Sequence, residues 1–202
     1  MPSAEARLRL APPGPAERKR LLAGLAAPPV EAARFLLGKI LVRRAGRATL
    51  AARIVETEAY LGVDDPAAHA YGGRRTRRTE PLWGPPGTIY VYFVYGMHHC
   101  LNVSVEREGV PGCVLIRAAE AMGGLALGSL RGPGRLCRTL RLDTSDSGRY
   151  LFDPASRLTL REGPPPAAIG VSPRVGIRHA ADRPLRFFDA DSREVTSPGR
   201  AR

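Results

Sequence analysis

A short stretch of alternating polar residues carries the most chemistry in this chain. In the sequence R-I-V-E-T-E-A-Y-L at residues 53–61, Glu56, Glu58 and Tyr60 alternate with other residues. Because alternate residues of a strand share a face, the two carboxylates and the phenol point the same way. In a cleft, one carboxylate could act as general base and the ring as a stacking surface. The alternative is an ordinary solvated polar face, which this stretch alone slightly favours because buried carboxylates need partners.

Two features of the following loop are of interest. Four arginines surround Thr76 within residues 74–78, directly after two glycines. Such a cluster can clamp phosphates, and a solvated charge run is an equal alternative. His69 alone is an ordinary loop residue, and it gains interest only from these neighbours.

An aromatic hairpin follows. Residues 88–95 are aromatic and β-branched, which is typical of a strand, and residues 100–105 resume the pattern. The tip of this hairpin carries Tyr95, where a large ring could wedge between base pairs. The alternative is a ring that folds back onto its own sheet. Tyr90 and Tyr92 share one face and could flank a base or fill a core.

Metal and nucleotide-cofactor chemistry is not expected. The run His98-His99-Cys100 invites a metal interpretation, but adjacent residues of an extended chain point to opposite faces. The sequence contains no C-x-x-C, H-E-x-x-H, G-x-G-x-x-G or P-loop pattern. We therefore expect no metal and no cofactor.

Several strands and a few helices must position these residues. A helix is predicted from Pro29 to Gly38, and another after residue 135. Strands are expected at residues 39–44, 48–61, 88–95, 100–105, 114–117 and 184–188, and the stretch 163–173 as a loop. The pattern indicates an α+β domain. Residues 1–24, which are rich in proline and basic residues, are expected to form a flexible basic arm with a short helix near its end.

Composition narrows the class of protein. The chain has 202 residues, 31 Lys+Arg and 19 Asp+Glu, for a net charge of +12. This excess suggests an anionic partner such as nucleic acid or a membrane surface. The alternative is that the richness in arginine reflects coding bias and not binding. No stretch approaches 18 apolar residues, no secretory signal is visible, and three cysteines are too few for a disulfide framework. We expect a cytoplasmic location, associated with the nucleoid in a bacterium.

These segments together closely resemble the alkyladenine (3-methyladenine, or methylpurine) DNA glycosylase family. The resemblance covers residues 28–198 in the family's order, and its E-T-E-A-Y-L-G and Y-V-Y-x-x-Y-G-M stretches are specific. The matching stretches are L-L-G-K at 36–39, I-V-E-T-E-A-Y-L-G at 54–62, A-A-H at 67–69, G-G-R at 72–74, P-G-T at 86–88, Y-V-Y at 90–92, Y-G-M at 95–97, N-V at 102–103, V-L-I-R-A at 114–118, G-P-G-R-L-C at 132–137 and R-F-F at 186–188.

The resemblance implies a fold and a reaction. The fold would be a single domain over residues 25–202, with a curved, mainly antiparallel sheet, flanking helices and a protruding hairpin. The enzyme would act as a monomer on double-stranded DNA that contains damaged purines, and it would not bind a membrane. It would flip the damaged purine out of the duplex and hydrolyse its N-glycosidic bond, leaving an abasic site. Substrates in the family include 3-methyladenine, 7-methylguanine, hypoxanthine and ethenoadenine.

The resemblance also implies roles for residues around the reacting bond. Glu58 would activate the attacking water, which Arg117 and the backbone carbonyl of Val175 would hold with it. Both lysines, Lys19 and Lys39, lie outside this site, which fits water rather than a lysine Schiff base as nucleophile. The flipped base would be sandwiched by Tyr60, His69 and Tyr92, and Asn102 would exclude the exocyclic amino group of normal guanine.

The remaining implied roles concern DNA outside the pocket. Tyr95 would fill the gap left in the base stack, and Met97 and His98 would touch the minor groove beside it. Phosphates would be held by Arg74, Thr76 and Arg78.

Two other functions compete with this one. The first is a non-catalytic protein that binds DNA distortion through the minor groove, and it would not need Glu58. The second is an RNA-binding domain with aromatic strands, against which the lack of an RNP-type Gly/Phe pattern argues.

Overall fold

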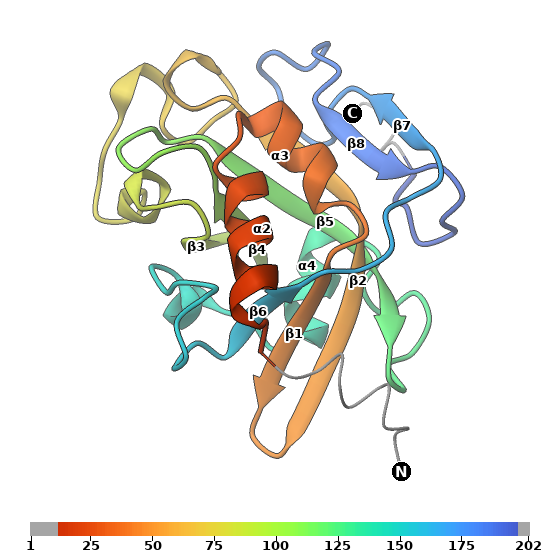
Figure 1. Ribbon diagram of the computed structural model, residues 1–202. Coiled ribbons are helices and arrows are strands. Elements are labelled where there is room, and N and C mark those ends of the chain that lie inside the picture. The colour runs from red at the N-terminus through yellow and green to blue at the C-terminus, as the bar shows by residue number, and fades with distance from the viewer. Residues whose placement is uncertain (1–11, 198–202) are drawn as a thin grey trace.

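A computed structural model describes residues 12–197 and shows one strongly curved sheet covered by helices (Figure 1). The strands pair antiparallel in the order β3-β4-β5-β2-β1-β6, and β8 joins β2 and carries β7. The strands are β1 (Ile40–Ala45), β2 (Ala48–Tyr60), β3 (Ile89–Val94), β4 (His98–Ser104), β5 (Cys113–Met122), β6 (Leu158–Arg161), β7 (Ile169–Ser172) and β8 (Arg186–Asp189). The expected α+β class and the curved antiparallel sheet are confirmed.

Strand β2 organises the sheet because it is long enough to have three partners. One edge pairs with β5 along most of its length. The other edge pairs first with β1, through residues 48–53, and then with β8, through residues 56–58. The change of partner turns the sheet at the point where Glu56 and Glu58 lie.

Helices α2 (Pro15–Leu25) and α3 (Pro29–Leu36) cover one face, and α4 (Pro133–Thr139) packs behind it on β4 and β5 (Figure 1). The sequence of α3 explains its orientation. Pro29 occupies the first turn, where a missing N–H costs nothing. Ala32, Ala33 and Leu36 share a buried stripe. From the facing strand, Thr57 donates a hydrogen bond of 2.9 Å to the carbonyl of Ala33.

The short helix that we expected near the end of the basic arm over residues 1–24 is present, but it is docked on the body of the protein. Residues 15–25 form α2, and its Leu21 and Leu25 are fully buried in the main core. Glu17 fixes the start of the helix by accepting a hydrogen bond of 2.9 Å from Arg161 on β6. The apolar spacing of the two leucines therefore docks this segment, despite its proline and basic residues. Residues 1–11 of the expected arm lie outside the described residues.

Two short strands, β6 and β7, were not anticipated. Strand β7 lies inside the segment 163–173, which we expected to be a loop because of its proline and glycine content. Both strands have four residues, too few to show a periodic pattern, and each exists because a neighbouring strand offers backbone partners.

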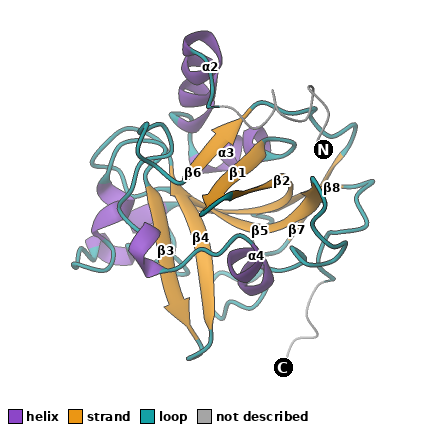
Figure 2. Ribbon diagram, turned by 90° about the horizontal axis from the view of Figure 1, so that it is seen from below, coloured by secondary structure: helices purple, strands orange, loops and turns teal. Residues whose placement is uncertain are grey.

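The β3–β4 hairpin extends beyond its neighbours, as the sequence predicted (Figure 2). Tyr95 and Gly96 at its tip have φ values of 54° and 66°. Two successive positive φ values are the geometry of the tight turn that matches strand twist. Tyrosine is uncommon there, because its side chain crowds the backbone at positive φ.

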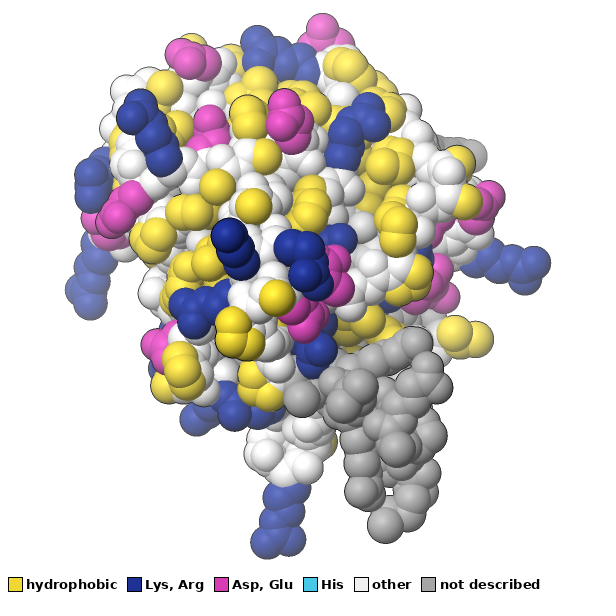
Figure 3. All heavy atoms as spheres, in the orientation of Figure 1, with side chains coloured by type: hydrophobic (Ala, Val, Ile, Leu, Met, Phe, Trp, Pro, Cys, Tyr) yellow, Lys and Arg dark blue, Asp and Glu magenta, His cyan; other side chains and the backbone are white. Residues whose placement is uncertain are grey.

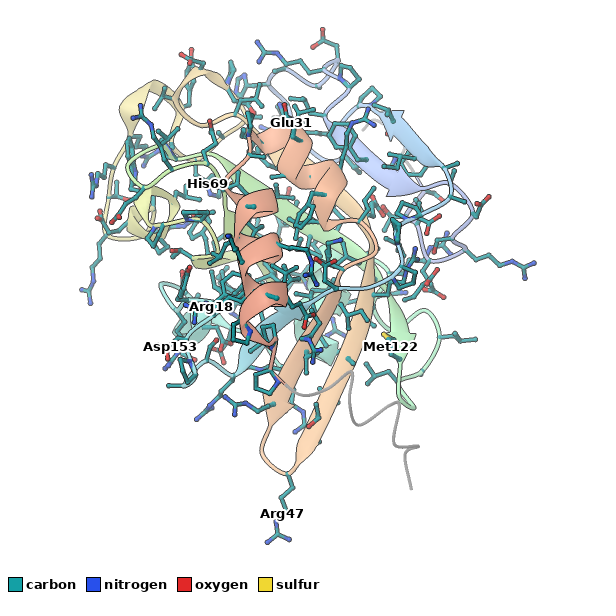
Figure 4. All side chains as sticks on the ribbon, in the orientation of Figure 1. Arg18, Glu31, Arg47, His69, Met122 and Asp153 are labelled. Atoms are coloured by element: carbon teal, nitrogen blue, oxygen red, sulfur yellow. The ribbon has the colours of Figure 1, made fainter. Side chains whose placement is uncertain are left out.

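The face covered by α2 and α3 carries basic and acidic side chains scattered among apolar ones (Figure 3). Arg47, at the β1–β2 turn, points away from the body of the molecule, at the end far from His69 (Figure 4). Within residues 12–197, no helix has the length and apolar character needed to cross a membrane.

Candidate active site

A double irregularity between β2 and β5 builds the centre of the site. Ile54 pairs with Ala119 and Glu56 with Ala118, so Val55 is an extra residue on β2. The next pair joins Thr57 to Ile116, so Arg117 is an extra residue on β5. Bulges re-aim side chains, and here the side chain of Arg117 reaches the carboxylates of β2.

Glu58 is fully buried and has three hydrogen-bonding or ionic neighbours. Its Oε1 accepts a 2.7 Å hydrogen bond from the backbone N–H of Val175 and lies 3.2 Å from Nη1 of Arg117. Its Oε2 accepts a 2.9 Å hydrogen bond from the hydroxyl of Tyr60. A carboxylate offers about four acceptor positions, so one remains for a further donor such as water.

The ionisation of Glu58 is set by opposing influences. Burial raises the pKa of this carboxyl above its ordinary value, and the charge of Glu56 acts in the same direction. Arg117, the Val175 N–H and the Tyr60 hydroxyl lower the pKa, because each stabilises the charged form. The net pKa is raised, so the carboxylate is a stronger proton acceptor than a glutamate in water.

An ion pair supports Tyr60 from the other side. The guanidinium of Arg174 lies 4.7 Å from the centre of the Tyr60 ring and donates a 2.9 Å hydrogen bond to Asp65. Arg174 and Asp65 are both buried. Burial alone would raise the pKa of Asp65, but the bonds from Arg174 and two backbone N–H groups lower it. The pair therefore stays ionised and fixes the loop next to Val175.

A pocket of about 200 Å³ opens beside Tyr60. Its walls combine aromatic rings and small residues, and its lining includes Tyr60, Ala67, Ala68, His69, Arg78, Leu82, Tyr90, Tyr92, Asn102, Cys113 and Ile177. Such a mixture of flat apolar walls and few polar groups is typical of a small-molecule site. Glu58 adjoins the pocket through its hydrogen bond to Tyr60.

The structure brings the three expected base-stacking rings to this pocket, with two of them in mutual contact. The centres of the His69 and Tyr92 rings are 4.6 Å apart, edge to face. Nδ1 of His69 lies 2.9 Å from the hydroxyl of Tyr90. A flat ligand between His69 and Tyr92 would have to separate them. Burial and the charges of Arg78 and Arg74 lower the pKa of His69, so its imidazole is neutral at pH 7.

Asn102 lies in the pocket wall with a fixed amide. Its Nδ2 donates to the carbonyls of Tyr90, at 3.2 Å, and Cys100, at 3.4 Å. The side chain is 3% exposed. Such anchoring turns the amide into a rigid part of the pocket wall.

Arg74, Thr76 and Arg78 line a second, adjacent hollow of about 400 Å³. Arg178 and His179, which the sequence reasoning did not single out, come to the same hollow. Arg78 borders both pockets, and its guanidinium lies 5.5 Å from the centre of the Tyr92 ring.

At the hairpin tip, Tyr95 and Met97 are 77% and 69% exposed. They project at the end of the hairpin, next to the pocket that Tyr95 also borders. His98 differs from them: it is half-buried, and its ring packs closely on Gly134 of α4.

Four polar residues of the site received no specific role from the sequence. Glu56 was noticed only as one of two carboxylates of which one could be a general base, and Arg186 only within the matching R-F-F stretch. Arg174 and Asp65 were not singled out. Val175 was expected to act through its carbonyl, and here its N–H is the group bonded to Glu58. Arg174, Val175 and Arg186 are distant in sequence from the carboxylates that they contact, so no local pattern marks them. Among residues 12–197, no cluster of His, Cys, Asp and Glu side chains could hold a metal ion.

Comparisons with known proteins show which sequences this chain resembles. The methylpurine-DNA glycosylase family model matches residues 23–193. A protein of Desulfitobacterium hafniense (strain Y51), provisionally named 3-methyladenine DNA glycosylase, is 44% identical over 187 residues, covering 81% of this chain and 91% of its own. The DNA-3-methyladenine glycosylase of Mus musculus is 42% identical over 189 residues, covering 80% of this chain and 56% of its own.

The fold, the pocket and these similarities define an enzyme of the DNA glycosylase class. The chain belongs to the methylpurine-DNA glycosylase family.

Proposed function

We propose that this enzyme excises alkylated and deaminated purines from double-stranded DNA, using a water molecule activated by Glu58. The observation that carries the proposal is a buried carboxylate with a raised pKa and an acceptor position to spare, next to an aromatic pocket. The lesions would be 3-methyladenine, 7-methylguanine, hypoxanthine and ethenoadenine. The enzyme would act as a monomer in the cytoplasm. Light scattering, which measures the molar mass, tests the monomer, and cell fractionation tests the location.

The chemistry would proceed as a hydrolysis. Glu58 accepts a proton from water, and the water oxygen forms a bond to C1′ of the sugar while the bond from C1′ to the purine nitrogen breaks. Arg117 stabilises the carboxylate before the proton moves, and the Val175 N–H orients it. The electron pair of the broken bond leaves with the purine, which departs more readily when it is cationic or protonated.

Binding would require the purine to leave the duplex. Tyr95 would fill the vacated place, and Met97 would touch the minor groove beside it. The base would stack on Tyr60 and between His69 and Tyr92 after these two rings separate. Asn102 would reject the amino group of normal guanine. Arg74, Thr76 and Arg78 would hold phosphates at the neighbouring hollow. His98, which is packed on Gly134, would contribute less than the other groups at the tip.

The test uses duplexes that each carry one of the four lesions, followed by alkaline cleavage of the abasic product. Wild-type enzyme should release the base from at least one of them. Glu58→Gln should release it about 10²- to 10⁴-fold more slowly, the usual contribution of a general base, while its affinity for the lesion duplex is kept. Glu80→Gln, which alters an exposed carboxylate paired with Arg75, is the matched control and should behave as wild type.

Two results would contradict the proposal. Undiminished release by Glu58→Gln would remove Glu58 from the mechanism, and a borohydride-trapped DNA adduct would show an amine nucleophile instead of water. Binding without release from every lesion would favour the non-catalytic distortion-binding protein.

A further inference from the structure

The second carboxylate of β2, Glu56, has no part in the proposed chemistry, yet it is the more elaborately bonded of the two. It is fully buried. Its Oε1 accepts hydrogen bonds from Nε of Arg117, at 2.9 Å, and Nε of Arg186, at 2.7 Å. Thr196 donates twice, from its hydroxyl to Oε1 and from its backbone N–H to Oε2, both at 2.7 Å. A buried carboxylate is retained at a cost unless such partners are present.

Arg117 contacts both Glu56 and Glu58, each through a different nitrogen of its guanidinium. Its Nε donates to Glu56, and its Nη1 lies 3.2 Å from Oε1 of Glu58. Because a guanidinium is planar and rigid, fixing Nε at one carboxylate fixes the direction of Nη1 toward the other. Arg117 stands at the irregularity between β2 and β5, where the regular strand register does not constrain its backbone.

The segment that leads to Thr196 is fastened at this residue and at the two residues before it. Arg186 donates a hydrogen bond of 2.5 Å to the carbonyl of Thr196. Just before it, Arg131 bonds the carbonyl of Val195 at 3.0 Å, and Glu194 accepts from the N–H of Gly128 at 3.1 Å. These contacts hold the two donors of Thr196 against Glu56, although 140 residues separate them in sequence.

We propose that Glu56 is a positioning residue of the glycosylase reaction: it orients Arg117 toward Glu58, and Thr196 holds Glu56 in place. The inference rests on the proposed function of Glu58 and extends the active site to the C-terminal segment. Glu56 does not touch the reacting atoms and acts only through Arg117.

The charge of Glu56 also reaches Glu58. The groups that influence Glu58 are Glu56 and Tyr60 from β2, Arg117 from β5, Cys100 from β4, and Arg174 with the Val175 N–H from the segment after β7. Glu56 raises the pKa of Glu58 and shares the charge of Arg117 with it. In Glu56→Gln the amide oxygen can still accept a weaker hydrogen bond from Nε of Arg117, so Arg117 stays beside Glu58 but is held less firmly. The charge of Glu56, which raises the pKa of Glu58, is gone. The pKa of Glu58 therefore falls, and the carboxylate becomes a weaker base.

The experiment measures the single-turnover rate of base release against pH, on a duplex that the wild type cleaves. Glu56→Gln should lower the plateau rate about 10- to 100-fold, which corresponds to the free energy of a hydrogen bond to a charged group. The acid limb of its pH–rate profile, where the rate falls as the pH is lowered, should move to lower pH. Glu56→Asp retains the charge and should keep the acid limb of the wild type. Affinity for the lesion duplex should change by less than about threefold.

A second pair of variants addresses the C-terminal contact and covers the case in which Glu56→Gln does not fold. Thr196→Val removes the hydroxyl donor but keeps size and backbone, and it should show the same slowing to a smaller degree. Thr196→Ser retains the hydroxyl and should restore the wild-type rate. Thermal melting of every variant separates lost positioning from unfolding.

The outcomes distinguish the two proposals. If Glu58→Gln is inactive while Glu56→Gln and Thr196→Val keep the rate and pH profile of the wild type, the positioning role is wrong and the proposed function stands. If Glu56→Gln is slower without any shift of the acid limb, and its melting temperature is also lower, then Glu56 has only a structural role. If Glu58→Gln is as active as the wild type, the proposed function itself fails.

Discussion

The hydroxyl of Tyr60 donates a 2.9 Å hydrogen bond to Oε2 of Glu58, the residue two positions earlier on β2. One contact thus couples the wall of the pocket to the carboxylate beside it. Burial and the neighbouring charge of Glu58 raise the pKa of Tyr60 well above its usual value. The phenol therefore stays protonated throughout the range in which DNA is stable, and it remains a donor to Glu58.

Removing that donor should weaken the enzyme on its acid side. In Tyr60→Phe the ring is kept and Glu58 loses one of the interactions that lower its pKa. The acid limb of the rate profile should therefore move to higher pH, the direction opposite to that expected for Glu56→Gln. A pH series of single-turnover rates checks this, and an unmoved limb would show that the hydrogen bond does not tune Glu58.

As the pH is lowered, the wild-type enzyme should begin to lose activity at a higher pH than an ordinary glutamate, with a pKa of about 4.3, would cause. The active form of Glu58 is the charged one, and its raised pKa means that protonation begins earlier as the pH falls. The lowered pKa of Asp65 keeps the Arg174–Asp65 pair ionised over the same interval, so the fold should persist. Circular dichroism at each pH provides the control, and coincident loss of structure and activity would contradict this explanation.

Tyr95 should contribute to lesion binding without contributing to stability. Its side chain is 77% exposed, and stacking of an aromatic side chain on a base is worth about 1–3 kcal/mol. Tyr95→Ala should therefore weaken binding of a lesion duplex about 5- to 150-fold at an unchanged melting temperature. Tyr95→Phe, which keeps the ring, should bind like the wild type. Equal binding by the alanine variant would show that the hairpin tip does not enter the base stack.

The Asp65–Arg174 pair should be required for stability. Removing one partner of a buried ion pair costs about 3–5 kcal/mol, so Asp65→Asn should lower the melting temperature by roughly 10 °C. The exposed pair of Arg75 and Glu80 provides the comparison. Glu80→Gln should leave the melting temperature nearly unchanged, because water screens an exposed ion pair. Similar melting temperatures for the two variants would show that the buried pair contributes little.

The sequence by itself determined the features that depend on neighbours along the chain. Alternation in E-T-E-A-Y placed Glu58 and Tyr60 on one face, because side chains of a strand alternate whatever the strand pairs with. The β3–β4 hairpin was also predictable from local sequence, because two runs rich in β-branched residues lie on either side of Tyr95 and Gly96. The family resemblance rested on these same local stretches.

Only the tertiary structure decided what surrounds the carboxylates. Arg117 reaches Glu58 because the strand register breaks beside it, and the Val175 N–H arrives from 117 residues away. Thr196 reaches Glu56 from still farther, and Leu21 docks a segment whose composition indicated a flexible arm. These contacts depend on packing between distant segments, and packing leaves no periodic trace in the residues that take part.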